Sequence, residues 1–190
     1  MIKNALAAIG LAAVVGMAVV ALVFGSRLAA FDPGAPGIYW AFAQRVLASG
    51  DPGVAMMWSV PVKDGLSTED VIESMKSLAT SRNLLFVGES PFYKQIEAIT
   101  GQGYRYVNFL SFCDAQVGRQ MLEYRDQYSG FMPCRIALVE DKQGKLWLYS
   151  MNLDLMIYGG AQLPDDLKAA ALRVRDSIRY IMDGAAVGEF

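Results

Sequence analysis

The sequence predicts an α+β fold: a small antiparallel sheet with packed helices, plus one N-terminal transmembrane helix. Three observations support this prediction. Beyond residue 54, short apolar strand-like runs are interspersed with amphipathic helical segments. The turn Asp141-Lys142-Gln143-Gly144 joins two of these runs as a hairpin. The first thirty residues are almost entirely apolar.

The composition excludes several classes of function. Hydrophobic residues make up 54% and charged residues 19% of the 190 residues, against about 25% charged in typical soluble domains. The net charge of −2 lacks the basic footprint of a nucleic-acid-binding protein. The chain has no histidine, which excludes His-dependent triads and His-ligated metal sites. We therefore expect no catalytic residue, no metal, no cofactor and no nucleic-acid partner.

The run Ala5–Phe24 carries no charged residue. At about 1.5 Å per helical residue it spans about 30 Å, the thickness of a bilayer core. The alternative is a cleaved signal peptide, whose apolar region is usually shorter, about 7–15 residues. Its best cleavage sequence, Leu28-Ala29-Ala30, has a bulky residue where small ones are preferred. A retained anchor over residues 1–31 is the favoured interpretation.

The charges that flank this run predict its orientation. Lys3 precedes it, whereas Arg27 behind it is soon balanced by Asp32. The positive-inside bias then places the N-terminus in the cytoplasm of a bacterium and the C-terminal domain in the periplasm.

A stripe of small residues, Ala8, Ala12 and Gly16, follows the spacing at which transmembrane helices approach one another closely. The stripe predicts packing against integral membrane subunits. The alternative is that alanine and glycine are simply common in this helix.

Residues 32–53 form a predicted juxtamembrane linker with a short aromatic helix. Breaker residues from Asp32 to Gly37 end the membrane helix, and Ile38–Ala48 then has a helical pattern. Tyr39, Trp40 and Phe42 lie on it, where aromatic side chains contact the membrane interface or a partner. The alternative is that this helix packs on its own domain.

Residues 54–190 are predicted to form the α+β domain. Ser67 and Asp70 have the spacing of a capping box at the start of a helix. Pro91 and Pro164 lie near the starts of two further helices. The predicted strands are 54–62, 84–87, 104–112, 135–140 and 145–150, and the predicted helices are 67–82, 90–101, 114–127 and one that begins at 164.

Cys113 and Cys134 are the only cysteines, each at a junction between predicted elements. They are consistent with a periplasmic disulfide, with two buried thiols or with a redox-active pair. The ten methionines include Met56-Met57, but they are scattered along the chain. Methionine usually fills gaps in cores, so core packing is favoured over a Cu(I) site.

Three segments resemble the domain-of-unknown-function 302 family: Phe112-Cys113-Asp114, Pro133-Cys134-Arg135 with the strand after it, and Gly144–Trp147 with Met151-Asn152. The resemblance covers roughly residues 54–183. It implies a small α+β domain, often dimeric, and no established reaction. A shared site would lie around Cys113, Asp114, Cys134 and Arg135. Arg135 could also pair with Asp114 across the strand ends, which would give both residues a purely structural role. The family usually has Asn at position 114.

The favoured function is that of a single-pass, non-catalytic accessory subunit of a larger bacterial inner-membrane complex, such as a respiratory or photosynthetic electron-transfer complex. Its expected partners are the lipid bilayer, integral membrane subunits and a second copy of the soluble domain. The alternative is a tethered periplasmic thiol/disulfide or small-ligand-binding protein that uses Cys113 and Cys134.

Overall fold

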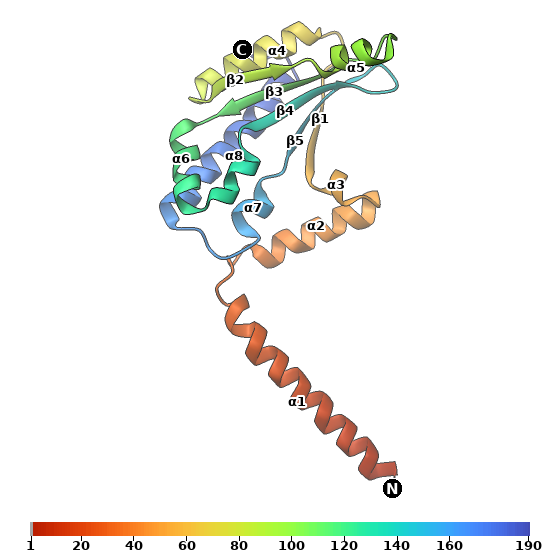
Figure 1. Cartoon of the computed structure of the whole chain (residues 1–190), viewed down its shortest axis with the longest axis vertical. Helices are drawn as coiled ribbons and strands as arrows, with labels where there is room; N and C mark the ends of the chain where they lie inside the picture. Colours follow the sequence, from red (N-terminus) through yellow and green to blue (C-terminus); the bar gives the residue numbers. More distant parts are fainter. Residues whose placement is uncertain (1) are drawn as a thin grey trace.

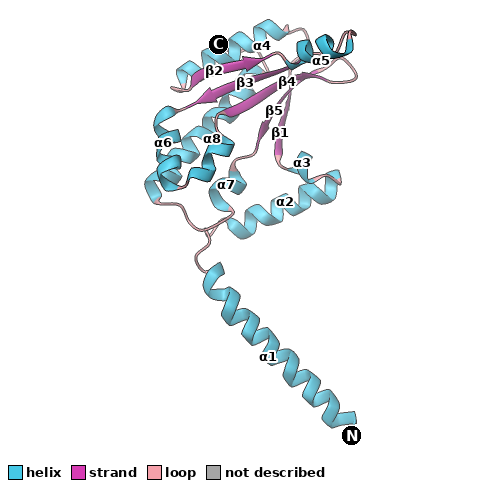
Figure 2. Cartoon of the chain, in the orientation of Figure 1, coloured by secondary structure: helices cyan, strands magenta, loops and turns pink. Residues whose placement is uncertain are grey.

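The computed structural model describes residues 2–190, with the side chains of residues 2, 4–8 and 26 excepted. A five-stranded antiparallel sheet has the order β1-β5-β4-β3-β2 and is packed on one face by helices (Figure 1, Figure 2). The strands are β1 (Met57–Pro61), β2 (Leu85–Ser90), β3 (Val107–Cys113), β4 (Cys134–Glu140) and β5 (Leu146–Met151). The helices are α1 (Ile2–Leu28), α2 (Ala35–Ser49), α3 (Pro52–Ala55), α4 (Thr68–Ser81), α5 (Phe92–Thr100), α6 (Ala115–Tyr124), η1 (Asp126–Phe131), α7 (Asp154–Tyr158) and α8 (Asp165–Ala185). The α+β prediction is confirmed.

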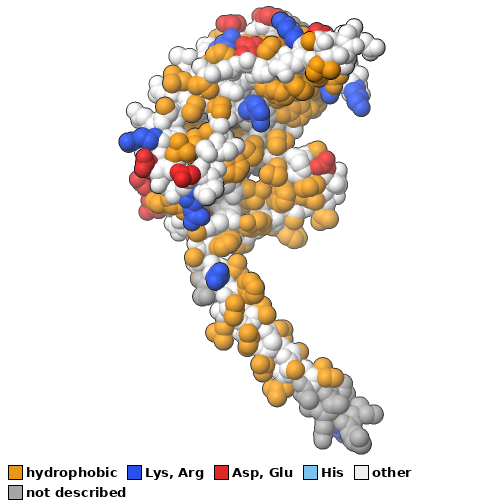
Figure 3. Space-filling view, viewed as in Figure 1, with side chains coloured by type: hydrophobic (Ala, Val, Ile, Leu, Met, Phe, Trp, Pro, Cys, Tyr) orange, Lys and Arg blue, Asp and Glu red, His pale blue; other side chains and the backbone are white. Residues whose placement is uncertain are grey.

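Helix α1 projects away from the rest of the chain (Figure 1). Figure 3 shows hydrophobic side chains along the surface of this helix. Every large apolar side chain described in α1 is more than half exposed. These side chains are Ile9, Leu11, Val14, Val15, Met17, Val19, Val20, Leu22, Val23, Phe24 and Leu28. Among the residues whose side chains are described, no helix is both long and apolar enough to cross a membrane. The predicted helix is thus present, but the predicted anchor is not confirmed. Ala8 of the small-residue stripe lies outside the described side chains.

A buried carboxylate fixes the chain where it leaves α1. Asp32 is 2% exposed, forms an ion pair with Lys168 of α8 and accepts a hydrogen bond from the Gly34 N–H at 2.8 Å. The Asp32 N–H donates to the Gly160 carbonyl at 2.8 Å. Phe31 forms an isolated β-bridge with Ala161 next to it. The start of the predicted juxtamembrane linker is therefore held against the body of the domain.

Helix α2 lies below the sheet and contacts α7 (Figure 1). The Tyr39 hydroxyl donates to the Gly159 carbonyl at 2.6 Å, and Phe42 lines a small hollow between α2 and α7. Trp40 is 66% exposed. Phe42 therefore packs on its own domain, as one of the two interpretations predicts. Trp40 faces outward, as contact with the membrane interface or a partner requires.

The main core lies between the sheet and the helices α4 and α8. Alternate strand residues such as Leu110, Phe112, Ile136, Leu138 and Leu148 are fully buried there. They pack against Val71, Met75 and Leu78 of α4 and Ile178, Ile181 and Met182 of α8. The opposite face of the sheet keeps Arg135 and Met57 exposed. One covered face and one open face are common in antiparallel sheets.

Local signals predicted several boundaries well. The capping box of Ser67 and Asp70 begins α4, and Asp141 accepts backbone N–H groups of Gln143 and Lys145 in the hairpin turn. The strand predicted for residues 54–62 is shorter, because Asp51 caps the brief helix α3 before β1 begins. The helix predicted for 114–127 ends at Tyr124 and is followed by the 3-10 turn η1.

Substitution of Asp32 by Asn tests the junction. It retains an acceptor for Gly34 but leaves the Lys168 ammonium, which is mostly buried, without its counter-charge. We expect a loss of about 2–4 kcal/mol in the free energy of unfolding, measured by urea denaturation. The control Asp166→Asn removes an exposed charge from α8 and should change stability little.

The same pair predicts an acid dependence. The hydrogen bond from Lys168 and then that from Gly34 lower the pKa of Asp32 below 3.8. A carboxylate with a lowered pKa stabilises the folded state above its unfolded pKa, and this contribution disappears as pH falls below about 4. Stability measured from pH 6 to pH 3 should therefore fall more steeply in the native chain than in Asp32→Asn. Parallel curves would contradict this assignment.

Candidate functional site

A narrow cavity of about 50 Å³ lies where β3 ends and β4 begins. Helices α6, α7 and α8 and the turn η1 contribute the other walls. The lining is mostly apolar and includes both cysteines. The lining residues are Phe112, Cys113, Asp114, Val117, Gly118, Met121, Tyr128, Phe131, Met132, Cys134, Leu153, Met156, Ala171 and Val174. The volume suffices for a few water molecules or one small ligand group.

Strand pairing brings the two cysteines to this cavity. Cys134 is the first residue of β4 and lies opposite Phe112 of β3. Cys113 follows Phe112 as the last residue of β3. Both thiols are half-buried and free. The structure therefore describes the pair as two free, partly buried thiols.

Burial keeps these thiols protonated at neutral pH. It raises the pKa of Cys134 to about 11, with a smaller contribution from the neighbouring Cys113. Burial also raises the pKa of Cys113, with help from the charge of Asp114. A thiol is nucleophilic only as the thiolate, so neither side chain has the lowered pKa of a catalytic cysteine.

Asp114 and Arg135, which the family resemblance suggested as a possible ion pair, have other partners in the structure. Asp114 caps α6 and accepts hydrogen bonds from the N–H groups of Gln116 and Val117 at 2.9 and 3.1 Å. The Arg135 guanidinium lies 5.6 Å from the ring centre of Phe109. Because side chains alternate along β4, Arg135 lies on the open face of the sheet, away from the Asp114 cap.

A larger cleft follows the open face of the sheet. Its volume is about 580 Å³, and it is lined by Met57, Phe109, Ser111, Gly130, Phe131, Met132, Pro133, Cys134, Arg135, Ala137, Tyr149, Ser150, Met151, Leu153 and Ile178. Four residues, Phe131, Met132, Cys134 and Leu153, line both this cleft and the small cavity. The cavity therefore adjoins the open face of the sheet.

The sequence analysis missed two features of this region. Met121, Met132 and Met156 join the cysteines in the cavity wall, although they lie far apart in the sequence. The open face was detectable in part, because Phe109, Tyr149 and Met151 occupy the alternate positions of their strands, where polar residues are usual. Of the other predicted residues, Tyr39, Trp40 and Phe42 lie outside the cavity lining.

The fold and the site define a class: an α+β domain with a one-sided antiparallel sheet and a thiol-lined cavity at the β3–β4 end. The model of the family "Domain of unknown function DUF302" matches residues 58–185. The chain belongs to this family. The match agrees with the resemblance at Cys113, Cys134 and the hairpin.

A solved structure shares the fold. It is the crystal structure of an uncharacterized conserved DUF302 protein from Bacillus stearothermophilus, with a TM-score of 0.56 and 14% sequence identity. The similarity covers 67% of this chain and 96% of that one. No curated protein matches this sequence.

The raised pKa of Cys134 predicts slow alkylation. In the variant Cys113→Ser, Cys134 is the only thiol, and its burial is retained. With a pKa of about 11, the thiolate fraction at pH 8 is about 0.1%, against about a quarter for an ordinary thiol. We expect iodoacetamide to react about a hundredfold or more slowly with the folded protein than with the urea-unfolded one. Similar rates in the two states would refute the raised pKa.

Proposed function

We propose that this protein is a single-pass, membrane-anchored and non-catalytic accessory subunit of a larger bacterial inner-membrane complex. The observation that carries the proposal is the apolar surface of α1, from Ile9 to Leu28. Apolar side chains occupy consecutive positions such as Val14-Val15, Val19-Val20 and Leu22-Val23-Phe24, so they cover every side of the helix. A helix that is apolar all round is normally buried in protein or in lipid.

Lipid is the better candidate for the cover, because α1 projects from the domain (Figure 1). The uncharged run Ala5–Phe24 matches the thickness of a bilayer core. In this proposal Lys3 stays on the cytoplasmic side and the α+β domain lies in the periplasm. Trp40, exposed on α2 just beyond the junction, suits the membrane interface or a partner subunit.

The fixed junction at Asp32 supports a role in an assembly rather than that of a freely tethered domain. The ion pair with Lys168 and the backbone hydrogen bond to Gly160 hold the end of α1 against α8 and the loop before it. A domain held close to its anchor presents a limited set of surfaces to membrane neighbours. The open face of the sheet, with Phe109, Tyr149 and Met151 in its cleft, offers a surface to a subunit or to a second copy.

We propose an electron-transfer complex, respiratory or photosynthetic, as the assembly to test first. The role we propose there is a structural one, and the chain supplies no histidine ligand for a haem.

A second candidate is a tethered periplasmic thiol/disulfide or small-ligand-binding protein that uses Cys113 and Cys134. The observation in its favour is that both thiols line one cavity next to the open cleft. The raised pKa values of both thiols favour ligand binding over thiol exchange.

Packing of the small-residue stripe gives a testable prediction. Gly16→Leu places a bulky side chain on the face that also carries Ala12, and it should prevent close approach of a partner helix. After extraction in a gentle detergent, we expect the native chain to migrate within a large complex on a native gel. The Gly16→Leu variant should migrate as a monomer or simple dimer.

The matched control is Ala21→Leu, which adds similar bulk on the opposite side of α1 and should leave the complex intact. Chains that co-purify with the native protein, identified by mass spectrometry, would name the partners. The subunit proposal fails if the native protein itself migrates as a monomer or simple dimer.

A further inference from the structure

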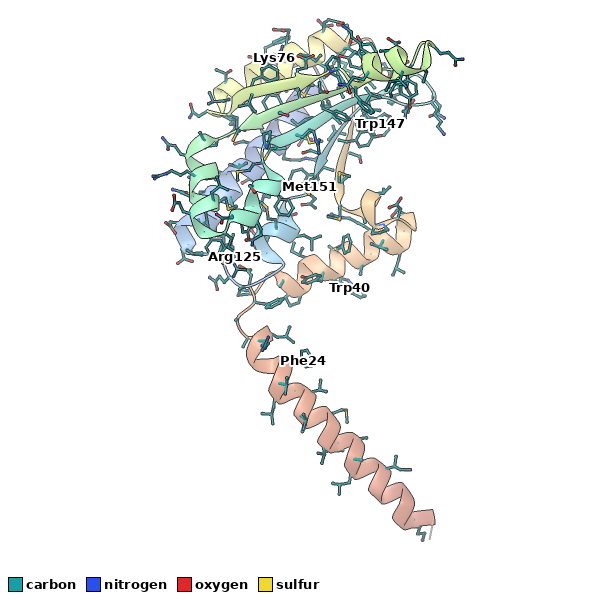
Figure 4. The ribbon with its side chains drawn as sticks, viewed as in Figure 1. Phe24, Trp40, Lys76, Arg125, Trp147 and Met151 are labelled. Atoms are coloured by element: carbon teal, nitrogen blue, oxygen red, sulfur yellow. The ribbon has the colours of Figure 1, made fainter. Side chains whose placement is uncertain are left out.

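Five sulfur-bearing side chains line the small cavity: Cys113, Cys134, Met121, Met132 and Met156. They come from the end of β3, the start of β4, α6, the segment after η1 and α7. Figure 4 draws the described side chains as sticks, with sulfur atoms in yellow. Three thioethers and two thiols therefore line one cavity of about 50 Å³ and form a set of sulfur donors. Because these residues are scattered along the sequence, their spacing does not predict this grouping.

Two of these sulfur atoms lie near Gly118 on α6. A Cβ atom on Gly118 would lie 3.2 Å from the Met132 Sδ and 3.8 Å from the Cys113 Sγ. Both atoms thus face the same point on α6, and glycine leaves room for them. Cys134 lies opposite Phe112, the residue that directly precedes Cys113 in β3.

The chemistry of the donors selects the ligand. Thiolate and thioether sulfur are soft ligands that favour Cu(I), whereas Mg²⁺ and Ca²⁺ require oxygen. In the part of the chain that the structure describes, no group of three or more Cys, Asp or Glu side chains is placed to hold a metal ion. The carboxylate of Asp114 caps α6 instead. A zinc site, which needs about four nitrogen, oxygen or thiolate ligands, therefore has too few donors here.

We propose that this cavity binds one soft monovalent metal ion, Cu(I), through Cys113, Cys134 and Met132, with Met121 and Met156 in the surrounding wall. Binding through one cysteine replaces the thiol proton, so that Cu⁺ and the S–H group give a neutral copper thiolate and a proton released to solvent. Coordination by the second cysteine releases a second proton. The copper stays in the +1 state throughout, and the thioethers add donors without adding charge.

Access to the cavity supports this proposal. Met132 and Cys134 also line the open cleft on the sheet, so an ion or its carrier reaches two of the donors from that face. The site lies wholly in the α+β domain, and it does not depend on the membrane anchor or on a partner complex.

The test is a competition titration of the full chain in detergent, under anaerobic and reducing conditions. Cu(I) is supplied as its acetonitrile complex, and the chromogenic chelator bathocuproine disulfonate competes for it. We expect one copper per chain. The apparent affinity should rise by about tenfold per pH unit for each thiol proton released.

Two variants of equal volume identify the donors. Met132→Leu removes a thioether from the cavity and keeps the packing volume, and it should weaken binding by about tenfold or more. The control Met57→Leu removes a thioether from the open face, outside the cavity wall, and should leave affinity unchanged. Circular dichroism confirms that both variants are folded.

Any one of four outcomes would overturn the proposal. The chelator could hold all of the copper, the affinity could be independent of pH, or Met132→Leu and Met57→Leu could bind equally well. An equal affinity for Zn²⁺, measured with a zinc indicator, would also overturn it, because a thioether-containing site discriminates against zinc.

Discussion

Burial of the Asp32 carboxylate fixes where the N-terminal helix leaves the rest of the molecule. A carboxylate is rarely buried without a counter-charge, and Lys168 of α8 supplies one. The pair joins two segments far apart in the sequence, the end of α1 and the start of the last helix. It thus couples the helix that projects from the molecule to the helix that covers the sheet.

Helix α8, which carries Lys168, packs on the sheet and also lines the cavity. The ion pair with Asp32 is thus linked through α8 to both. Helices α4 and α8 cover one face of the sheet, and the other face remains open. At the β3–β4 end, α6, α7 and η1 close over the strands and enclose the cavity. The position of Cys134 opposite Phe112 directs it toward this cavity, whereas the next residue, Arg135, lies on the open face. The cavity therefore lies at this end of the sheet and meets the cleft on the open face at Met132 and Cys134, with Arg135 in the cleft lining.

Features with local causes were predictable from the sequence. The capping box of Ser67 and Asp70 and the Asp141 turn involve residues within a few positions of one another, so their spacing is sufficient evidence. In the structure Asp114 caps α6 and Arg135 lies over Phe109 on the open face. These contacts depend on strand alternation and packing, which sequence spacing alone does not give. Helix α7 was not predicted at all, since its five residues are too few to show a helical period.

The grouping of sulfur atoms could not be predicted, because it depends on tertiary structure. Met121, Met132 and Met156 meet Cys113 and Cys134 only after five segments have packed. Sequence spacing gives no measure of such a cluster. The family match likewise defines the fold of residues 58–185, while the chemistry of the cavity follows from the side chains that this particular chain places there.

The central claim about function is that α1 lies in lipid. The most direct measurement is alkaline carbonate extraction of membranes from cells that express the untagged chain, followed by mass determination of the protein. The account predicts that the intact chain, with residues 1–31 still attached, remains in the membrane pellet. A mature protein released into the supernatant and cleaved near Ala30 would contradict it.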